Sequence, residues 1–167
     1  MEKNYDRRGF IKTAAVAGIG MGISGSLSSM NSQNAQPGGW IGIIGLDTSH
    51  VIAFTRAINE GNEEGRPEFK GFKVVAAYPT KGSADLPASI DRLEGFTERV
   101  SKMGVEIVGS IDELLEKTDA ILLESVDGRR HLKEAVPVFK AGKRMFIDKP
   151  LSNNLAGAIA IWEASKK

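Results

Sequence analysis

The sequence of 167 residues contains no cysteine, which excludes disulfide bonds, thiolate metal sites and thiol nucleophiles. It is also poor in aromatic residues, at 7%, and has only two histidines. The formal net charge is +1, and the chain after residue 39 has no stripe of basic residues that could neutralise nucleic-acid phosphates. We therefore expect no nucleic-acid partner. Hydrophobic residues, at 41%, suffice for one folded domain at this length.

Charged residues are absent between Thr13 and Ala35, directly after a basic segment that contains Arg7 and Arg8. A basic start followed by a short apolar run is typical of an export signal, and the run is shorter than the roughly 20 apolar residues that span a membrane. The paired arginines, followed closely by Phe-Ile-Lys, resemble the twin-arginine (Tat) signal, whose pathway exports folded proteins. We expect residues 1–39 to be a Tat signal and flexible tether that engages the Tat translocation machinery. The expected location is periplasmic, with membrane tethering if the signal stays uncleaved.

From residue 40 onward, short apolar runs rich in β-branched residues alternate with segments of helical periodicity. The apolar runs predict strands at 40–46, 72–78, 105–108, 120–124 and 144–147. Helices are predicted at 51–60, 91–103, 111–117, 129–141 and 153–166, with a loop at 79–90. Because strands that alternate with helices are joined by right-handed crossovers, we predict an α/β fold with a doubly wound parallel sheet, Rossmann-like, over residues 40–167.

Ligands of such sheets bind at the carboxyl ends of the strands, so the turn after the first strand is the first candidate site. This turn, Gly45-Leu-Asp-Thr-Ser-His50, keeps only the first glycine of the G-x-G-x-x-G dinucleotide fingerprint. Asp47 and His50 occupy the other two glycine positions, and a carboxylate about 4 Å from a phosphate repels it by roughly 1 kcal/mol in water. Asp47 therefore either serves a ligand or complements the positive end of the next helix, which Thr48 or Ser49 would cap.

Other ionisable residues are predicted to lie at the same edge of the sheet. They could converge as metal ligands or as an acid and base for a polyol hydroxyl, without a diagnostic spacing. The residues in question are Asp47, His50, Asp127, His131 and Asp148. The alternative is that both histidines begin helices and face water. The adjacent Arg129 and Arg130 could bind an anionic group or could remain solvated without a specific role.

The triplet Asp148-Lys149-Pro150 ends the fifth apolar run, where a catalytic group would lie. Proline favours an extended conformation for Lys149 and lacks a backbone donor, which restricts where the ammonium points. A partly desolvated lysine at this position could exchange a proton with a substrate hydroxyl. The alternative is a solvated lysine in a strand-to-helix turn.

Three motifs together resemble the amino-terminal domain of the Gfo/Idh/MocA oxidoreductases, over about residues 40–167. They are Ile41-Gly-Ile-Ile-Gly45, Lys140-Ala-Gly-Lys143 and Met145-Phe-Ile-Asp-Lys-Pro-Leu151. The resemblance implies NAD or NADP as the cofactor and a sugar or cyclitol as the small-molecule substrate. It implies that Lys149 is catalytic, because this residue matches the lysine of the family's Glu-Lys-Pro motif. It assigns a second catalytic role to His131, which matches the histidine of the family's Pro-Asn-x-x-His turn.

The resemblance also implies a set of cofactor-binding residues at the ends of the strands, and it assigns no residue to a metal. The cofactor-binding residues are Gly45, Leu46, Asp47, Thr48, Ser49, His50, Tyr78, Ser125, Asp148 and Pro150. The second strand ends in Tyr78-Pro79, without the acid that holds a ribose hydroxyl, and Lys81 could contact a phosphate instead.

Family enzymes carry a second domain that forms the substrate wall, and this chain stops one helix after the lysine motif. We therefore expect a fragment or lone domain, inactive by itself, whose partner is a missing carboxy-terminal domain or another copy of the chain. Three functions follow as hypotheses. The first is an NAD(P)-dependent oxidoreductase domain, the second is a sugar- or polyol-binding module that has lost the cofactor, and the third is metal-assisted hydrolase or lyase chemistry at the histidines.

Overall fold

The computed structural model describes residues 39–166. Apart from Gly39, the predicted Tat signal and tether lie outside the described residues. Among the helices of the described part, none has the length and apolar character that crossing a membrane requires.

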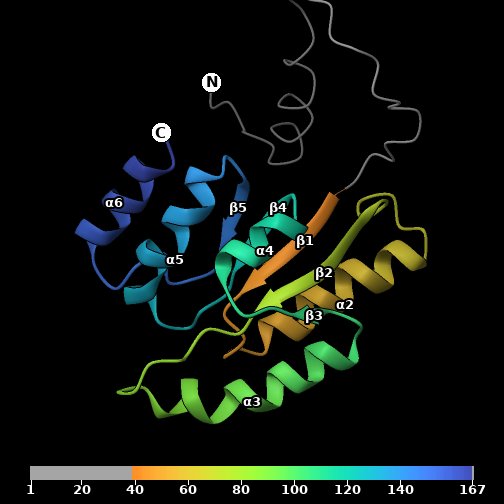
Figure 1. Ribbon diagram of the computed structural model, residues 1–167, viewed down its shortest axis with the longest axis horizontal. Coiled ribbons are helices and arrows are strands. Elements are labelled where there is room, and N and C mark those ends of the chain that lie inside the picture. Colours follow the sequence, from red (N-terminus) through yellow and green to blue (C-terminus); the bar gives the residue numbers. More distant parts are fainter. Residues whose placement is uncertain (1–38, 167) are drawn as a thin grey trace, which may run out of the picture. The chain divides into compact units, whose positions relative to one another are not determined.

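Five parallel strands form one sheet in the order β3-β2-β1-β4-β5 (Figure 1). The strands are β1 (Gly39–Ile44), β2 (Phe72–Tyr78), β3 (Glu106–Ile107), β4 (Ala120–Leu123) and β5 (Arg144–Ile147). The helices described are α2 (His50–Glu63), α3 (Pro87–Lys102), α4 (Ile111–Lys117), α5 (Gly128–Lys140) and α6 (Leu155–Ala164). The winding direction reverses between β1 and β4, which confirms the predicted doubly wound α/β fold.

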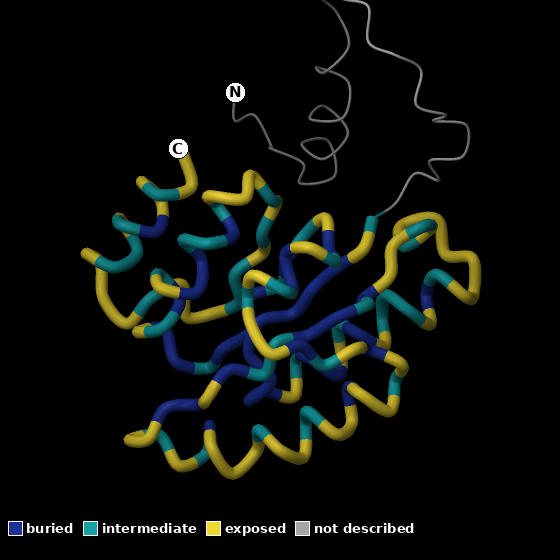
Figure 2. Tube along the Cα trace, viewed as in Figure 1, coloured by how far each residue is buried: buried dark blue, intermediate teal, exposed yellow. Residues whose placement is uncertain are grey.

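The helices form one layer on each face of the sheet, with α2 and α3 on one side and α4, α5 and α6 on the other (Figure 1). Successive residues of β1 point to opposite faces. Ile43 belongs to the core cluster that includes Val51 of α2, and Ile44 to the cluster that includes Leu114 of α4. Figure 2 shows these central strands as the buried centre of the domain. Burial on both faces explains the continuous apolar run in the sequence.

Two predicted boundaries are wrong in an informative way. Helix α3 begins at Pro87, four residues before the predicted start at Asp91, and Pro87 lies in its first turn. Proline is favoured there because its missing N–H has no partner in a first helical turn and its φ already suits a helix. The loop between β2 and α3 is correspondingly short. The third strand covers only Glu106–Ile107, half of the predicted length.

The β5 and α6 end of the domain exposes large apolar side chains. The exposed fractions are 49% for Phe146, 76% for Leu155, 52% for Ile159 and 63% for Trp162. The sequence of α6, LAGAIAIWEA, is apolar around most of the helix, and Ile161 is its one fully buried residue. This end of the domain therefore presents an apolar surface, whereas the centre of the sheet is well covered.

Candidate functional site

The turn after β1 lies at the topological switch point, where ligands of doubly wound sheets bind. Gly45 has φ +86°, and a Cβ added to it would lie 2.5 Å from the backbone nitrogen of Ser125, in the turn after β4. Only glycine allows both this conformation and this close approach. Gly45 N–H also donates to the Tyr78 carbonyl at the end of β2, at 2.9 Å. The turns after β1, β2 and β4 are therefore locked together.

Asp47 is 1% exposed, and both of its carboxylate oxygens accept hydrogen bonds from the protein. Oδ1 accepts from Val126 N–H at 3.1 Å, and Oδ2 accepts from the Ser89 hydroxyl in the first turn of α3 at 2.5 Å. Asp47 makes no hydrogen bond to α2, so its carboxylate joins the turn after β4 to α3 instead of capping the following helix. Ser49 is exposed at the N-cap of α2 and makes no side-chain capping bond.

Thr48 and Leu46, on either side of Asp47, are also buried in this turn. Thr48 is buried, and its Oγ1 accepts from His50 N–H at 3.3 Å, so the predicted contribution of a turn hydroxyl to the helix start comes from Thr48 and not from Ser49. Leu46 is fully buried in the core, and its N–H donates to the Pro79 carbonyl at 3.3 Å. Leu46 therefore shapes the turn through its backbone and packing and does not offer a side chain to a ligand.

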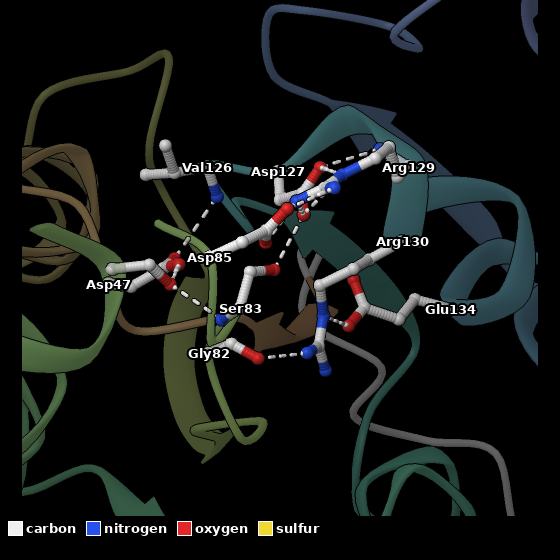
Figure 3. Close-up of polar contacts among 10 residues, drawn as sticks. Asp47, Gly82, Ser83, Asp85, Val126, Asp127, Arg129, Arg130 and Glu134 are labelled. Atoms are coloured by element: carbon white, nitrogen blue, oxygen red, sulfur yellow. Dashed lines mark hydrogen bonds and ion pairs between the residues drawn. The ribbon is translucent and has the colours of Figure 1, made fainter. Parts of the chain in front are cut away.

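The loop between β2 and α3 folds back onto the turn after β4 through a polar network (Figure 3). The Ser83 hydroxyl donates to Asp127 at 2.6 Å, and the Arg129 guanidinium bridges Asp127 and Asp85 at 2.7 and 2.6 Å. Hydrogen bonds from Arg129 and Ser83 hold the pKa of Asp127 well below its usual range, although burial of the carboxyl opposes the shift. Asp127 also caps α5 by accepting from Arg129 N–H at 3.0 Å.

Arg130, the next residue, also donates hydrogen bonds to groups of the protein. Its Nε donates to Glu134 at 2.9 Å and its Nη1 donates to the carbonyl of Gly82 (Figure 3). Glu134 in turn accepts from the Ser125 hydroxyl at 2.7 Å. Both arginines are thus paired with groups of the protein, and the network connects the loop after β2 to the first turns of α5.

A cavity of about 600 Å³ opens where β2 ends, between the start of α4 and the start of α5. Its lining carries four cationic side chains and one carboxylate. The residues that line it are Tyr78, Lys81, Ile111, Arg129, Arg130, Lys133, Glu134 and Pro137. Arg129 and Arg130 are paired with carboxylates, so Lys81 and Lys133 are the lining cations that remain for an anionic ligand, next to Tyr78 at the end of the second strand.

His131 does not face water, so that alternative is wrong for this histidine. Its side chain is fully buried in α5, with Nε2 2.6 Å from the Ser125 carbonyl oxygen and Nδ1 3.2 Å from the Leu151 carbonyl oxygen. The ring connects the turn after β4 with the segment after β5. Because both ring nitrogens contact the backbone, the geometry supports a positioning role, and the catalytic assignment of His131 stays a prediction.

His50, Glu124 and Asp148 meet between the ends of β4 and β5. The His50 Nδ1 lies 2.5 Å from Asp148 Oδ2, and one ligand atom of each of the three residues lies within 4.8 Å of the others. Of the five residues considered as convergent ligands, the structure brings only His50 and Asp148 together, because Asp47, Asp127 and His131 have the separate partners described above.

Glu124 is the member of this cluster that was not predicted. It is 1% exposed, and neither carboxylate oxygen has a hydrogen-bond partner within residues 39–166. Burial raises the pKa of Glu124 to about 8, the nearby charge of Asp148 adds to the rise, and the charge of Lys149 opposes it. The only sequence signal was a single acidic residue at the end of the apolar run in β4.

Asp148 and Lys149 begin the segment after β5. Burial disfavours the charged form of Asp148, but the hydrogen bond from His50 and the backbone N–H of Lys149 outweigh it and lower its pKa. Lys149 is exposed next to this cluster, and Pro150 packs against the start of α5, where a Cβ on Gly128 would lie 3.1 Å from its ring. The predicted catalytic lysine and the turn after β1 thus lie on one edge, joined through His50 and Asp148.

The known proteins that this chain matches include two dehydrogenases and a ketoreductase. The chain is 30% identical over 123 residues to inositol 2-dehydrogenase 3 of Saccharopolyspora erythraea, which covers 74% of this chain and 30% of the relative. The fold matches UDP-N-acetylglucosamine 3-dehydrogenase from Acidithiobacillus ferrooxidans with a TM-score of 0.55 and 17% identity, over 77% of this chain and 35% of that one. No family model matches the chain.

A 3-ketoreductase from Actinomadura kijaniata, solved with NADP and TDP-benzene, matches with a TM-score of 0.50 and 25% identity. The match covers 76% of this chain and 34% of the reductase. The chain thus spans about a third of the length of the proteins it matches. These similarities establish the Rossmann-like fold and support the resemblance to the Gfo/Idh/MocA oxidoreductases.

Proposed function

We propose that the described residues form the dinucleotide-binding domain of an exported, NAD(P)-dependent oxidoreductase of the Gfo/Idh/MocA family that acts on a hydroxyl of a sugar or cyclitol. The position of Lys149 carries this proposal. Lys149 leaves β5 at the carboxyl edge of the sheet, and the preceding residue, Asp148, contacts His50 of the turn after β1 at 2.5 Å. The proposed proton-transfer group and the proposed cofactor turn are therefore neighbours.

The residues at this edge fit a nicotinamide dinucleotide in two places. The cationic cavity at the end of β2 lies where Rossmann-like domains hold the adenosine ribose, and Tyr78 replaces the acid that binds a 2′-hydroxyl. This favours the 2′-phosphate of NADP over NAD. The start of α2, where the Ser49 side chain makes no capping bond, can receive the pyrophosphate on its backbone N–H groups. Asp47 lies in the same turn, and its carboxylate charge opposes phosphate binding although both of its oxygens accept hydrogen bonds from the protein.

In this proposal the cofactor supplies hydride transfer and this chain supplies proton transfer. When bound, the nicotinamide exchanges a hydride with the carbon that bears the substrate hydroxyl. Lys149 accepts the hydroxyl proton during oxidation and returns it during reduction. Asp148 and the Lys149–Pro150 bond fix the start of the segment that carries the amine. Because the matched part of the chain covers only about a third of each relative, we propose that a second domain or another copy completes the substrate site, and that this chain alone binds cofactor without turnover.

Cofactor binding tests the proposal directly. We expect the full chain to quench or shift NADPH fluorescence on binding, with an affinity at least about tenfold higher than for NADH. Lys81→Ala and Lys133→Ala, which remove cations from the cavity lining, should weaken NADPH binding and leave NADH binding nearly unchanged. Lys102→Ala is the matched control, because this lysine is exposed on α3 and paired with Glu98.

Two results would contradict the cofactor proposal. The absence of binding for the oxidised and reduced forms of both nucleotides would remove it, and retained binding of a free sugar or cyclitol would then favour the non-redox module. Equal losses for NADPH and NADH in the Lys81→Ala variant would remove the NADP preference alone.

The proposed export rests on Arg7 and Arg8, the uncharged run after them and the segment Phe10-Ile-Lys. Residues 1–39 fused to a folded fluorescent reporter should deliver it to the periplasm through the Tat machinery. Replacing both arginines by lysine keeps the charge and should retain the reporter in the cytoplasm, because the Tat pathway reads the arginine pair. Unchanged export of the lysine variant, or export through a pathway that carries unfolded chains, would overturn this proposal.

A further inference from the structure

Three side chains from separate elements converge at the edge of the sheet beside Lys149. His50 comes from the first turn of α2, Glu124 follows β4, and Asp148 follows β5. One ligand atom of each lies within 4.8 Å of the others. His50 and Asp148 are 98 residues apart in the sequence, so the fold and not a local motif builds this cluster.

Glu124 is the part of the cluster that the protein leaves incomplete. Its carboxylate is buried, at 1% exposure, and neither oxygen has a hydrogen-bond partner among the residues that the structure describes. Buried polar side chains in native proteins almost always have partners, and a buried carboxylate is unfavourable without one. Asp47 is equally buried at the same edge, and both of its oxygens are bonded. The unpartnered oxygens of Glu124 therefore point to an occupant from outside residues 39–166.

We propose that His50, Glu124 and Asp148 bind a divalent transition-metal ion, of which Zn²⁺ and Mn²⁺ are the representative cases. One imidazole nitrogen with two carboxylate oxygens is a donor set for first-row ions such as these, and the two carboxylates match the charge of a divalent cation. Three protein ligands leave at least one position open, which a water molecule or a hydroxyl oxygen of a polyol can occupy. This site goes beyond the proposed function and does not depend on it.

Two phenylalanine rings next to the cluster restrict the position of the His50 ring. The His50 ring packs edge-to-face on Phe54, one turn along α2, with centroids 6.1 Å apart. Phe54 in turn packs on Phe146 of β5 at 5.9 Å. The aromatic row restricts the imidazole to the side where Asp148 and Glu124 lie. Ligands about 2 Å from a tetrahedral ion are themselves about 3.3 Å apart, so small side-chain movements suffice to close the site.

Metal titration of the full chain tests this site. The protein is prepared with any histidine tag removed, stripped with EDTA, exchanged into chelator-free buffer, and titrated calorimetrically with ZnCl₂ and separately with MnCl₂. We expect one ion per chain for at least one metal, together with a higher melting temperature in its presence. Glu124→Gln, which keeps the shape and removes the charge, should weaken binding at least about tenfold. His50→Gln should do the same.

Glu163→Gln is the matched control, because it makes the same chemical change at an exposed glutamate on α6, and it should bind as the wild-type protein does. Circular dichroism establishes that each variant is folded. If Glu124→Gln does not fold, His50→Gln decides, because the His50 side chain is 37% exposed and tolerates replacement. Wild-type protein without a stoichiometric ion, or folded His50→Gln with unchanged affinity, would overturn the proposal.

The same samples separate this inference from the proposed cofactor function. NADPH binding measured in EDTA reports on the cofactor site alone. NADPH binding without metal binding would remove only the metal site, and metal binding without any nicotinamide nucleotide binding would remove only the cofactor proposal.

Discussion

Asp47 and Glu124 follow neighbouring strands of the sheet and are equally buried, but their surroundings differ completely. Asp47 lies in the region formed by the turns after β1, β2 and β4, where its oxygens accept from Val126 and Ser89. Glu124 faces the region between β4 and β5, where its oxygens accept from no group in the described part of the chain. The first region is internally satisfied and stabilises the edge. The second is left open and has the character of a binding site, because a folded chain rarely leaves a buried charge without a partner.

The strongest test of the first region is Gly45→Ala. The residue would have to keep φ at +86° while its Cβ lay 2.5 Å from the Ser125 nitrogen. Left-handed strain and overpacking together should lower the free energy of unfolding by about 4 kcal/mol. Urea denaturation monitored by circular dichroism measures this loss. Gly95→Ala is the control, since nothing lies within 4 Å of an added Cβ in α3. A loss below about 1 kcal/mol would show that the three turns are not locked together.

Asp47→Ala should have the next largest effect. It leaves the half-buried Val126 N–H and the buried Ser89 hydroxyl without their acceptor, and the free energy of unfolding should fall by about 3 kcal/mol. Denaturant midpoints measure the change, and Asp91→Ala, at an exposed position of α3, is the control. If the two variants were equally stable, the hydrogen bonds of Asp47 would contribute nothing and the contrast with Glu124 would disappear.

Glu124→Gln should act in the opposite direction when metal is removed with EDTA. The raised pKa of Glu124, about 8, means that the unfolded chain releases this proton more readily, so the carboxyl lowers stability as pH rises from about 4.5 to 8. Glutamine resembles the protonated acid and avoids that loss. The variant should gain about 2 kcal/mol at pH 8 and nothing near pH 5. Thermal unfolding across this pH range measures the gain, and a variant less stable at pH 8 would contradict the open character of the second region.

Arg129→Ala should have the smallest effect on stability at pH 7, because the Arg129 side chain is partly solvated. Hydrogen bonds from Arg129 lower the pKa of Asp127, so the stabilisation is present above the ordinary aspartate pKa and is lost as pH falls below it. The difference between variant and wild type should therefore shrink below about pH 4. Acid unfolding followed by tryptophan fluorescence measures it. A stability difference between variant and wild type that grew on acidification would show that the effect does not come from the Arg129–Asp127 pair.

The fold could be predicted because its determinants are local. The run 40–46 was predicted as a strand and most of it lies in β1, since short β-branched runs flanked by glycines specify buried parallel strands. The start of α3 at Pro87 was missed because the small polar residues before Asp91 suggested a loop, while proline fits a first helical turn.

The site was less predictable because its partners are distant in sequence. Asp47 finds Ser89 at a separation of 42 residues and Val126 at 79. Neither pairing has a sequence signal, so whether Asp47 is satisfied could not be known. Glu124 went unnoticed for the same reason, since an acid at a strand end becomes informative only when its environment is seen to lack donors. The meeting of the turns at one edge, in contrast, follows from parallel topology alone.

The apolar surface of α6 has a practical consequence for work on this domain. Leu155, Ile159 and Trp162 are more than half exposed, and exposed apolar surface promotes aggregation of isolated domains. Light scattering should rise with protein concentration and with ionic strength in purified samples. Dilute, low-salt solutions are therefore the conditions in which calorimetry and fluorescence titrations will report on single molecules.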